Sequence, residues 1–399
     1  MTAPAATRAQ LPRTVVVLGW VSLLNDAASE MITPLLPVFL TATLGAGPAI
    51  VGLVEGVAEA TASVLKLLAG RLVDRGAGAK RLVFAGYGLA NLARPALGLA
   101  ALWPVVLLLR FADRVGKGVR TAPRDALIAG AAGAAIRGRA FGFHRSMDHA
   151  GAVVGPLVAF ALLSGGAALG RVFLWSALPG VLVLVLLGFG VPADAPLAPA
   201  AAPAPLRWRA LDARLRALLI AAAVLALATV PEVFVVLWAR ESGLPLDRVP
   251  LVWAGASLAK MLLAYPAGVA TDRYGRVPLL LAGWTLRVLA LAALAAVAAR
   301  GAAIWALFLG YSATLALTEP AERSLIGDVA PPAVRGTAFG LYHLASGLLV
   351  LPGAVLFGLV WERAGSGVAF GLAAVITALA ALGMALAART AARHLAREP

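Results

Sequence analysis

The sequence predicts an all-α membrane protein with twelve transmembrane helices in two six-helix bundles. Of its 399 residues, 61% are hydrophobic and only 13% are charged, whereas a typical soluble domain carries about 25% charged residues. A bilayer crossing needs about 20 apolar residues, so twelve crossings would use roughly 240 residues and leave short connections. This composition excludes a soluble globular protein.

Twelve apolar segments long enough to span a bilayer follow one another along the chain. The first six lie at residues 14–41, 49–70, 81–101, 103–127, 139–164 and 170–190. The last six lie at residues 213–239, 248–270, 277–299, 302–327, 337–361 and 366–388.

The basic residues predict the orientation of these segments. The chain has 34 Lys and Arg against 19 Asp and Glu, a net charge of +15. If both termini lie inside, eighteen basic residues fall on the cytoplasmic side, and only Arg171, Arg240, Arg248, Arg300 and Arg363 fall outside. Basic residues collect on the cytoplasmic side of membrane proteins. This rule predicts that both termini lie on the cytoplasmic side of the plasma (inner) membrane. The positive charge therefore indicates a lipid bilayer rather than a nucleic acid as partner.

The two halves are copies of each other. Gly70-x-x-x-Asp74-Arg75 recurs as Gly268-x-x-x-Asp272-Arg273, and Arg137-Gly138 recurs as Arg335-Gly336, both at an offset of 198 residues. Two motifs with one ungapped offset predict a six-plus-six repeat with a binding site between the halves. A Pro/Ala-rich stretch separates the copies. We expect one bundle at 1–190, a cytoplasmic linker at 191–212 and a second bundle at 213–399.

The loop from Gly268 to Arg276 resembles the signature of the major facilitator superfamily. In that family the glycine allows a tight helix end, the aspartate faces a helix N-terminus, and the arginine pairs with carboxylates across the cytoplasmic face. The stretch from Asp328 to Gly336 resembles the inner loop after the tenth helix of the same family. The resemblance implies that the cytoplasmic gate comprises Gly70, Asp74, Arg75, Asp125, Arg137, Gly268, Asp272, Arg273, Gly275, Arg276 and Arg335.

Two shorter motifs resemble the drug:proton antiporter branch of this superfamily. Pro34-Leu35-Leu36-Pro37 is similar to the PxxP of its first helix, and Gly151 to Pro156 is similar to its GxxxGP motif, with Gly151, Gly155 and Pro156 in place. The closing glycine pair of that motif is replaced by Ala159 and Phe160. Small residues at this spacing also serve plain helix packing.

Ionisable residues within the predicted spans mark a candidate coupling site, because such residues usually face a cavity or a partner. Asp26 and Glu30 lie one turn apart in the first span, roughly 18 and 24 Å from its inner end. Two carboxylates this close favour proton binding by one of them. Proton coupling is therefore expected at Asp26, Glu30 and Asp113, the last in the fourth span.

A basic stripe in the fourth span, Arg110, Arg114 and Lys117, shares one helix face. The resemblance brings this stripe and the acidic pair to one cavity, where Arg114 or Lys117 would act as a moving counter-charge. Glu59 and Asp148 join the substrate or counter-charge group. His144 and His149 are weaker candidates for a proton relay, Lys66 and Arg94 are expected to snorkel, and Trp238 is expected in an interfacial belt. The C-terminal half is expected to supply more of the apolar wall, and its ionisable residues within the spans are Glu232, Lys260, Glu319, Glu322 and His343.

These observations predict a secondary transporter that works by alternating access, with a small molecule and protons as partners, no cofactor, no metal and a monomeric state. Proton-coupled efflux of an amphipathic or drug-like compound is the first hypothesis, and proton-coupled transport of a small organic anion is the second. A transporter-fold sensor is a third. An intramembrane enzyme is disfavoured because no His-Glu-x-x-His motif occurs, and the absence of cysteine excludes thiolate chemistry and disulfides.

Overall fold

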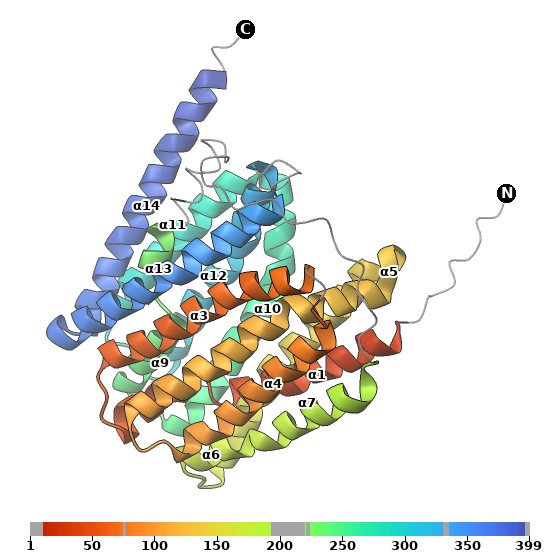
Figure 1. Cartoon of the computed structure of the whole chain (residues 1–399). Coiled ribbons are helices and arrows are strands. Elements are labelled where there is room, and N and C mark those ends of the chain that lie inside the picture. Colours follow the sequence, from red (N-terminus) through yellow and green to blue (C-terminus); the bar gives the residue numbers. More distant parts are fainter. Residues whose placement is uncertain (1–10, 75–76, 193–219, 221–223, 330–334, 396–399) are drawn as a thin grey trace.

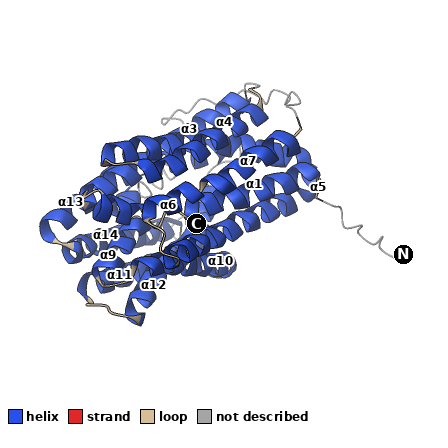
Figure 2. Ribbon diagram, turned by 90° about the horizontal axis from the view of Figure 1, so that it is seen from below, coloured by secondary structure: helices blue, strands red, loops and turns tan. Residues whose placement is uncertain are grey.

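The computed structural model describes residues 11–74, 77–192, 220, 224–329 and 335–395. Every regular element in these ranges is a helix (Figure 2). In Figure 1 the helices coloured red to yellow-green form one group, and those coloured green to blue form a second group against it. Nearly all of the expected linker lies outside the described residues, so the domain boundaries stay a prediction.

The N-terminal group contains α1 (Arg13–Glu30), α2 (Leu36–Val38), a π-helical turn (Phe39–Thr43), α3 (Pro48–Asp74), α4 (Ala79–Ala96), a 3-10 turn (Leu97–Leu99), α5 (Trp103–Ser164), α6 (Leu169–Trp175) and α7 (Ala177–Gly190). The C-terminal group contains α9 (Glu232–Glu241), a 3-10 turn (Leu246–Arg248), α10 (Val249–Tyr274), α11 (Arg276–Ala296), α12 (Ala302–Val329), α13 (Arg335–Ala364) and α14 (Ser366–Leu395).

The first apolar segment of each half is broken, which corrects the two continuous helices expected there. Helix α1 ends at Glu30 and the chain resumes helical structure at Leu36, because the prolines at 34 and 37 lack the backbone N–H that a helix needs. In the second half the chain is not helical at residues 229–231, just before α9. Adding 198 to residues 31–35 gives 229–233, so the two breaks occupy equivalent places in the repeat.

Helix α5 covers the fourth and fifth expected segments, and the residues between them, where a loop was expected, are also helical. We call residues 103–127 the first limb and residues 139–164 the second limb of α5. The two limbs lie side by side. Asp113 is joined through Arg94 to Asn25, and Asp148 bonds to Ser22 one turn away on α1. A straight helix would separate Asp113 from Asp148 by about 52 Å. The chain therefore folds back within α5, as the expected topology requires.

Eight of the described helices are long and apolar enough to span a membrane by length and composition. They are Pro48–Gly70, Ala140–Ser164, Leu169–Gly190, Leu246–Tyr274, Arg276–Ala296, Ala302–Glu319, Leu344–Ala364 and Ser366–Leu386. Of the remaining four expected segments, the one at 213–239 is described only in part. The other three, α1, α4 and the first limb of α5, each carry at least three charged residues, which lowers their mean hydropathy.

The two groups share one apolar core at one end and have separate cores at the other. The shared core includes residues 31–40 of the first group and residues 233–239 of the second, and we call this the closed end. Near the turn at Gly275 the described clusters draw on one group each: Val15, Leu18 and Tyr87 in the first, Leu280 and Trp284 in the second. We call this the open end.

Close contact between α3 and α13 holds the closed end together. A Cβ on Gly52 would collide with the backbone of Ala354, and a Cβ on Gly56 would collide with Leu351. The Glu362 carboxylate accepts a hydrogen bond from the backbone N–H of Ala49 at 3.0 Å, at the start of α3. Small residues thus let helices from different halves approach closely, as is common in membrane bundles.

Candidate functional site

A buried ion network surrounds Asp113 in the N-terminal group. The Nε of Arg94 lies 2.8 Å from Asp113 Oδ1, and guanidinium nitrogens of Arg110 and Arg114 lie 3.5 and 3.6 Å from Asp113 Oδ2. The Asp113 side chain has no exposed surface. A buried charge must be paired to be tolerated, and three guanidinium groups stabilise the carboxylate form. This environment suits a fixed counter-charge better than a group that exchanges protons.

The same network reaches α1 and α3. Arg94 donates from one nitrogen to the backbone oxygen and to Oδ1 of Asn25, at 3.1 and 2.8 Å. Arg110 pairs with Glu55 of α3 at 3.0 Å. Arg94 is only 3% exposed, so the expectation that it snorkels is wrong: its guanidinium joins three helices inside the bundle.

The acidic pair of α1 lies beside this network and at the junction of the two groups. Asp26 accepts a hydrogen bond from the Asn25 side chain at 3.0 Å and forms no ion pair with any described residue. Glu30 accepts a hydrogen bond at 2.7 Å from the indole N–H of Trp253, which belongs to α10 of the other group. Both carboxylates are half-buried. Glu30 therefore links the two groups directly.

The basic stripe is divided by its surroundings. Arg110 and Arg114 are held at Asp113, whereas the ammonium of Lys117 forms no ion pair with a described residue within 4.0 Å. Lys117 interacts electrostatically over longer distances with Glu59, Asp26 and Glu30. It is therefore the cation of the stripe that interacts electrostatically with all three of these carboxylates.

The C-terminal group adds a smaller polar cluster. Lys260 pairs with Glu232 at 2.6 Å, and its ammonium lies 5.7 Å from the centre of the Trp253 ring. Ser312 donates a hydrogen bond to Glu232, and the Tyr311 hydroxyl donates to the backbone oxygen of residue 230 in the helix break. Polar groups thus run from Glu30 through Trp253 and Lys260 to the break.

Asp148 connects the second limb of α5 to α1. It accepts a hydrogen bond from Ser22, and His144 and Arg145 each lie 3.6 Å from its other oxygen. Within the described residues, no group of three His, Asp or Glu side chains could hold a metal ion.

The described residues of the gate motif at the open end include one exposed ion pair. Asp272 is 76% exposed and lies 3.5 Å from Arg276, the first residue of α11, while Arg273 stacks on Tyr274. Asp125 pairs with its neighbour Arg124 at 2.9 Å. Arg75 and the side chains of Asp74, Arg137 and Arg335 lie outside the described residues.

The glycines of the gate motif differ in their surroundings. Gly268 lies inside α10 with open space around its Cα, and Gly70 meets only an ordinary contact with Ala122. The tight turn falls instead at Gly275, whose φ of 90° is a conformation that side-chain-bearing residues rarely adopt.

The glycines of the GxxxGP stretch lie directly against α1. A Cβ on Gly151 would collide with the backbone oxygen of Leu23, and a Cβ on Gly155 would collide with that of Ala27. Pro156 follows inside the same limb. These positions bring α5 close to α1 beside Asp26.

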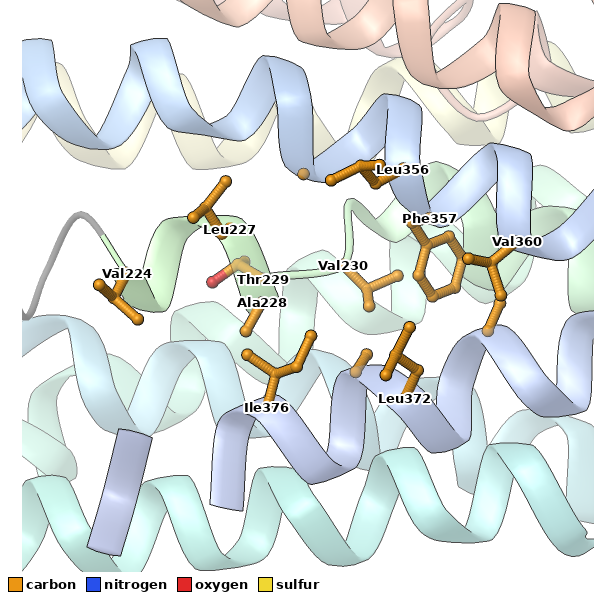
Figure 3. Close-up of a pocket in the computed structure, with 13 residues that line it drawn as sticks. Val224, Leu227, Ala228, Thr229, Val230, Leu356, Phe357, Val360, Leu372 and Ile376 are labelled. Atoms are coloured by element: carbon orange, nitrogen blue, oxygen red, sulfur yellow. The ribbon is translucent and has the colours of Figure 1, made fainter. Parts of the chain in front are cut away.

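Two cavities flank the helical piece that precedes α9. A polar cavity of about 250 Å³ is lined by Arg287, Thr318, Glu319, Glu322 and Tyr342, among others. An apolar cavity of about 270 Å³ lies on the other side of this piece, between α13 and α14 (Figure 3).

Sequence reasoning missed Arg94, Asn25 and Trp253. Depth could have identified Arg94, because it lies thirteen residues into the segment 81–101, or roughly 20 Å, the same level as Asp26. Nothing in the spacing identifies Trp253, since only the packing of the two halves brings it to Glu30. Trp238 is only 4% exposed in the shared core, which contradicts its expected place in an interfacial belt.

Comparison with known protein families gives one match that covers nearly the whole chain. The model of the Major Facilitator Superfamily matches residues 18–255 and 232–399. An uncharacterized MFS-type transporter of Methanocaldococcus jannaschii is 28% identical over 364 residues, which cover 88% of this chain and 89% of that protein. An uncharacterized protein of Mycobacterium bovis is 32% identical over 381 residues, which cover 90% of this chain and 89% of that protein.

Solved structures share the fold at low sequence identity. The nucleoside transporter NupG matches with a TM-score of 0.80 and 14% identity, covering 94% of this chain and 99% of the other. An inward-facing bacterial homologue of the human lysosomal transporter Spinster gives 0.78 and 18%, covering 96% and 98%. A D-xylose–proton symporter gives 0.72 and 18%, covering 93% and 96%.

Proposed function

The chain belongs to the major facilitator superfamily, and from that premise we propose that it is a proton-coupled antiporter that exports a small amphipathic or drug-like compound. The chain is a multi-pass membrane transporter and not an enzyme. Alternating access would rock the two helix groups against each other around a site between them. The separated cores at the open end support a state in which that end admits substrate.

The topology that we propose has twelve transmembrane helices, with both termini on the cytoplasmic side of the plasma (inner) membrane. The proposed units are bundles at 1–190 and 213–399 and a cytoplasmic linker at 191–212. A cysteine introduced at Pro203 should react with an impermeant maleimide only from the cytoplasm, and one at Gly45 only from outside. The chain has no cysteine of its own, so each introduced thiol is the sole target. Labelling of both from one side would contradict this topology.

The observation that carries the proposal is the hydrogen bond between Glu30 and Trp253. This hydrogen bond joins a carboxylate of one helix group to a donor of the other. Its strength therefore depends on whether Glu30 is protonated and on the relative position of the two groups. A charged carboxylate accepts a stronger hydrogen bond than a neutral carboxyl. Protonation of Glu30 would therefore weaken a contact that holds the closed end together.

Asp26 and Glu30 form the proposed proton site, with Lys117 as the counter-charge and Asp113 as a fixed anion within its arginines. A nearby cation stabilises the charged carboxylates, and desolvation stabilises the neutral form. Rocking would change both the distance to Lys117 and the access of water. Proton uptake on one face and release on the other would follow, and an opposite substrate flux makes the cycle an antiport.

Reconstituted protein in liposomes tests this assignment. Asp26→Asn and Glu30→Gln should abolish uphill transport driven by a pH gradient and leave downhill counterflow of labelled substrate largely intact. Asp247→Asn is the control, because this carboxylate lies in the turn before α10 and forms no ion pair with a described residue. Wild-type accumulation in both site variants would move the proton site to Glu55, Glu59 or Asp148. If the wild-type protein shows no counterflow of labelled substrate, the hypothesis of a transporter-fold sensor is favoured instead.

Proton-coupled transport of a small organic anion is the second candidate. The observation that favours it is Lys117, which forms no ion pair with a described residue within 4.0 Å, interacts electrostatically with Glu30 and could bind a carboxylate or phosphate. Ligand-induced thermal stabilisation across organic acids and cationic drugs separates the two candidates. Stabilisation by acids that is lost in Lys117→Gln would support the second candidate.

A further inference from the structure

The apolar cavity between α13 and α14 lies outside the coupling site and has a different chemistry. Leu227, Phe357, Leu372 and Ile376 form its walls, and Thr229 contributes a hydroxyl (Figure 3). At about 270 Å³ it approaches the size of pockets that bind part of a drug-sized molecule.

The mouth of this cavity lies on the outer surface of the C-terminal group. Leu356 is 58% exposed and Leu372 is 46% exposed. Ala354 faces α3, and Leu356 lies roughly 200° around the same helix, so it points away from the other group. Exposed apolar side chains on this surface of a spanning helix face the lipid chains. The cavity therefore opens to the bilayer.

The wall between this cavity and the polar cavity is one short helical piece thick. Val224, Leu227 and Ala228 line the apolar side, whereas Leu225 and Ala226 line the polar side. Thr229 lines both cavities. The helical structure stops there and resumes only at α9, so the two cavities meet at the break.

The polar cavity carries a negative balance. Among the described residues that line it, Glu319 and Glu322 are acidic and Arg287 is basic. Arg287 donates a hydrogen bond to Thr318 at 2.7 Å, and Glu322 accepts one from Tyr342 at 2.8 Å. Two carboxylates against one guanidinium favour a cationic group.

We propose that these two cavities form one binding site for a single-chain amphipathic cation that enters from the bilayer between α13 and α14. The apolar tail occupies the cavity at Leu372, and the cationic head lies beyond Thr229 near Glu319 and Glu322. The site rests on the proposed transport function and adds to it a substrate class and a route of entry.

Photolabelling in liposomes of neutral lipid tests the site. The probe is a dodecyltrimethylammonium ion with a diazirine near the end of its chain, and adducts are mapped by mass spectrometry. They should concentrate in residues 224–230, 353–360 and 369–376, and unlabelled dodecyltrimethylammonium should compete. Leu372→Trp fills the cavity and should lower labelling about tenfold. Leu379→Trp is the matched control, because it lies two turns along the same face of α14 and is 63% exposed.

The head-group specificity provides a second readout. A dodecyl sulfate probe of the same length should label the cavity weakly. The double substitution Glu319→Gln and Glu322→Gln should reduce labelling by the ammonium probe to the level seen with the sulfate probe. Leu372→Ala should leave the cavity open and its labelling intact. This result would show that Leu372→Trp lowers labelling by filling the cavity and not by misfolding the protein. Adducts spread evenly over lipid-facing residues, or equal labelling by both probes, would overturn the proposal. Labelling needs no ion gradient, so failure of pH-driven transport with intact labelling would refute the proposed function alone.

Discussion

At the scale of single residues, Asp113 is the anion on which the buried network depends. Asp113→Asn leaves Arg94, Arg110 and Arg114 without a common anion, and breaking a buried pair in this way costs about 3–5 kcal/mol. We expect a clear drop in the midpoint of thermal unfolding in detergent. The matched substitution Asp247→Asn removes a carboxylate outside the network and should leave the midpoint near wild type. Equal midpoints for the two variants would show that the network contributes little.

Trp253 tests the link between the groups without removing a charge. Trp253→Phe keeps an aromatic ring and deletes the hydrogen bond to Glu30, a bond to a charged group worth about 1.5–3 kcal/mol. The closed end should therefore open more often, and a cysteine at Leu40, buried there at 1% exposure, should react about tenfold to a hundredfold faster from outside. Trp305→Phe is the control, and an unchanged rate in Trp253→Phe would remove this contact from the coupling scheme.

The sequence was informative about which residues matter and less so about their partners. Depth and spacing placed Asp26, Glu30 and the stripe from Arg110 at a similar level, because both depend only on distance along a helix. The family resemblance was needed to bring them to one cavity. The different roles of Arg110, Arg114 and Lys117 depend on Arg94, which only the packing of the helices brings to Asp113. The hydrogen bond between Trp253 and Glu30 could not be predicted from the sequence for the same reason.

At the scale of elements, replacing a glycine of the GxxxGP stretch and replacing Gly268 of the gate motif should have opposite effects on the stability of the fold. Gly155→Ala forces α5 away from the backbone of Ala27 and should cost about 1–3 kcal/mol. Gly268→Ala meets open space in a helix and should stabilise by about 1 kcal/mol. Chemical unfolding of the two variants in mixed micelles measures both effects. A cost at Gly268 equal to that at Gly155 would mean that the gate glycine has a partner in another state.

The positions of eight spans could be predicted from hydropathy, whereas the ends and breaks of the helices could not. The prolines at 34 and 37 carried the signal for the first break, yet the apolar run continued through them and favoured one helix. The expected loop between the fourth and fifth spans, near residues 128–138, is helical, and its five alanines favour helix over turn.

At the scale of the whole molecule, the open end predicts how the gate motif acts. In this state Asp272 makes only a local, exposed contact with Arg276, so Asp272→Asn should leave the state intact. The hypothesis is that the substitution weakens the alternative state, in which this end closes, and therefore slows turnover more than it changes substrate affinity. A cysteine at Ser346 in the polar cavity should become more accessible from the cytoplasm. Unchanged transport and accessibility would contradict this role.

The repeat also shows how the halves have diverged. Arg110 and Glu55 form an ion pair, and the positions 198 residues later are Phe308 and Trp253, whose rings meet edge to face at 6.4 Å. The same two helix positions thus hold charge in one half and aromatic packing in the other. The sequence repeat predicted equivalent positions, and only the contacts reveal that they remain paired.

The balance of charge in the N-terminal group has a consequence for membrane voltage. Asp113, Glu55 and Asp148 each lie within 4 Å of an arginine, whereas neither Asp26 nor Glu30 forms an ion pair with a described residue. Binding of a proton at Asp26 or Glu30 would therefore change by one unit the net charge that this group carries through the field. Each unit charge gains about 2.3 kcal/mol per 100 mV, so an inside-negative potential would act differently on the protonated and unprotonated forms, and the current recorded from supported membranes should change with pH.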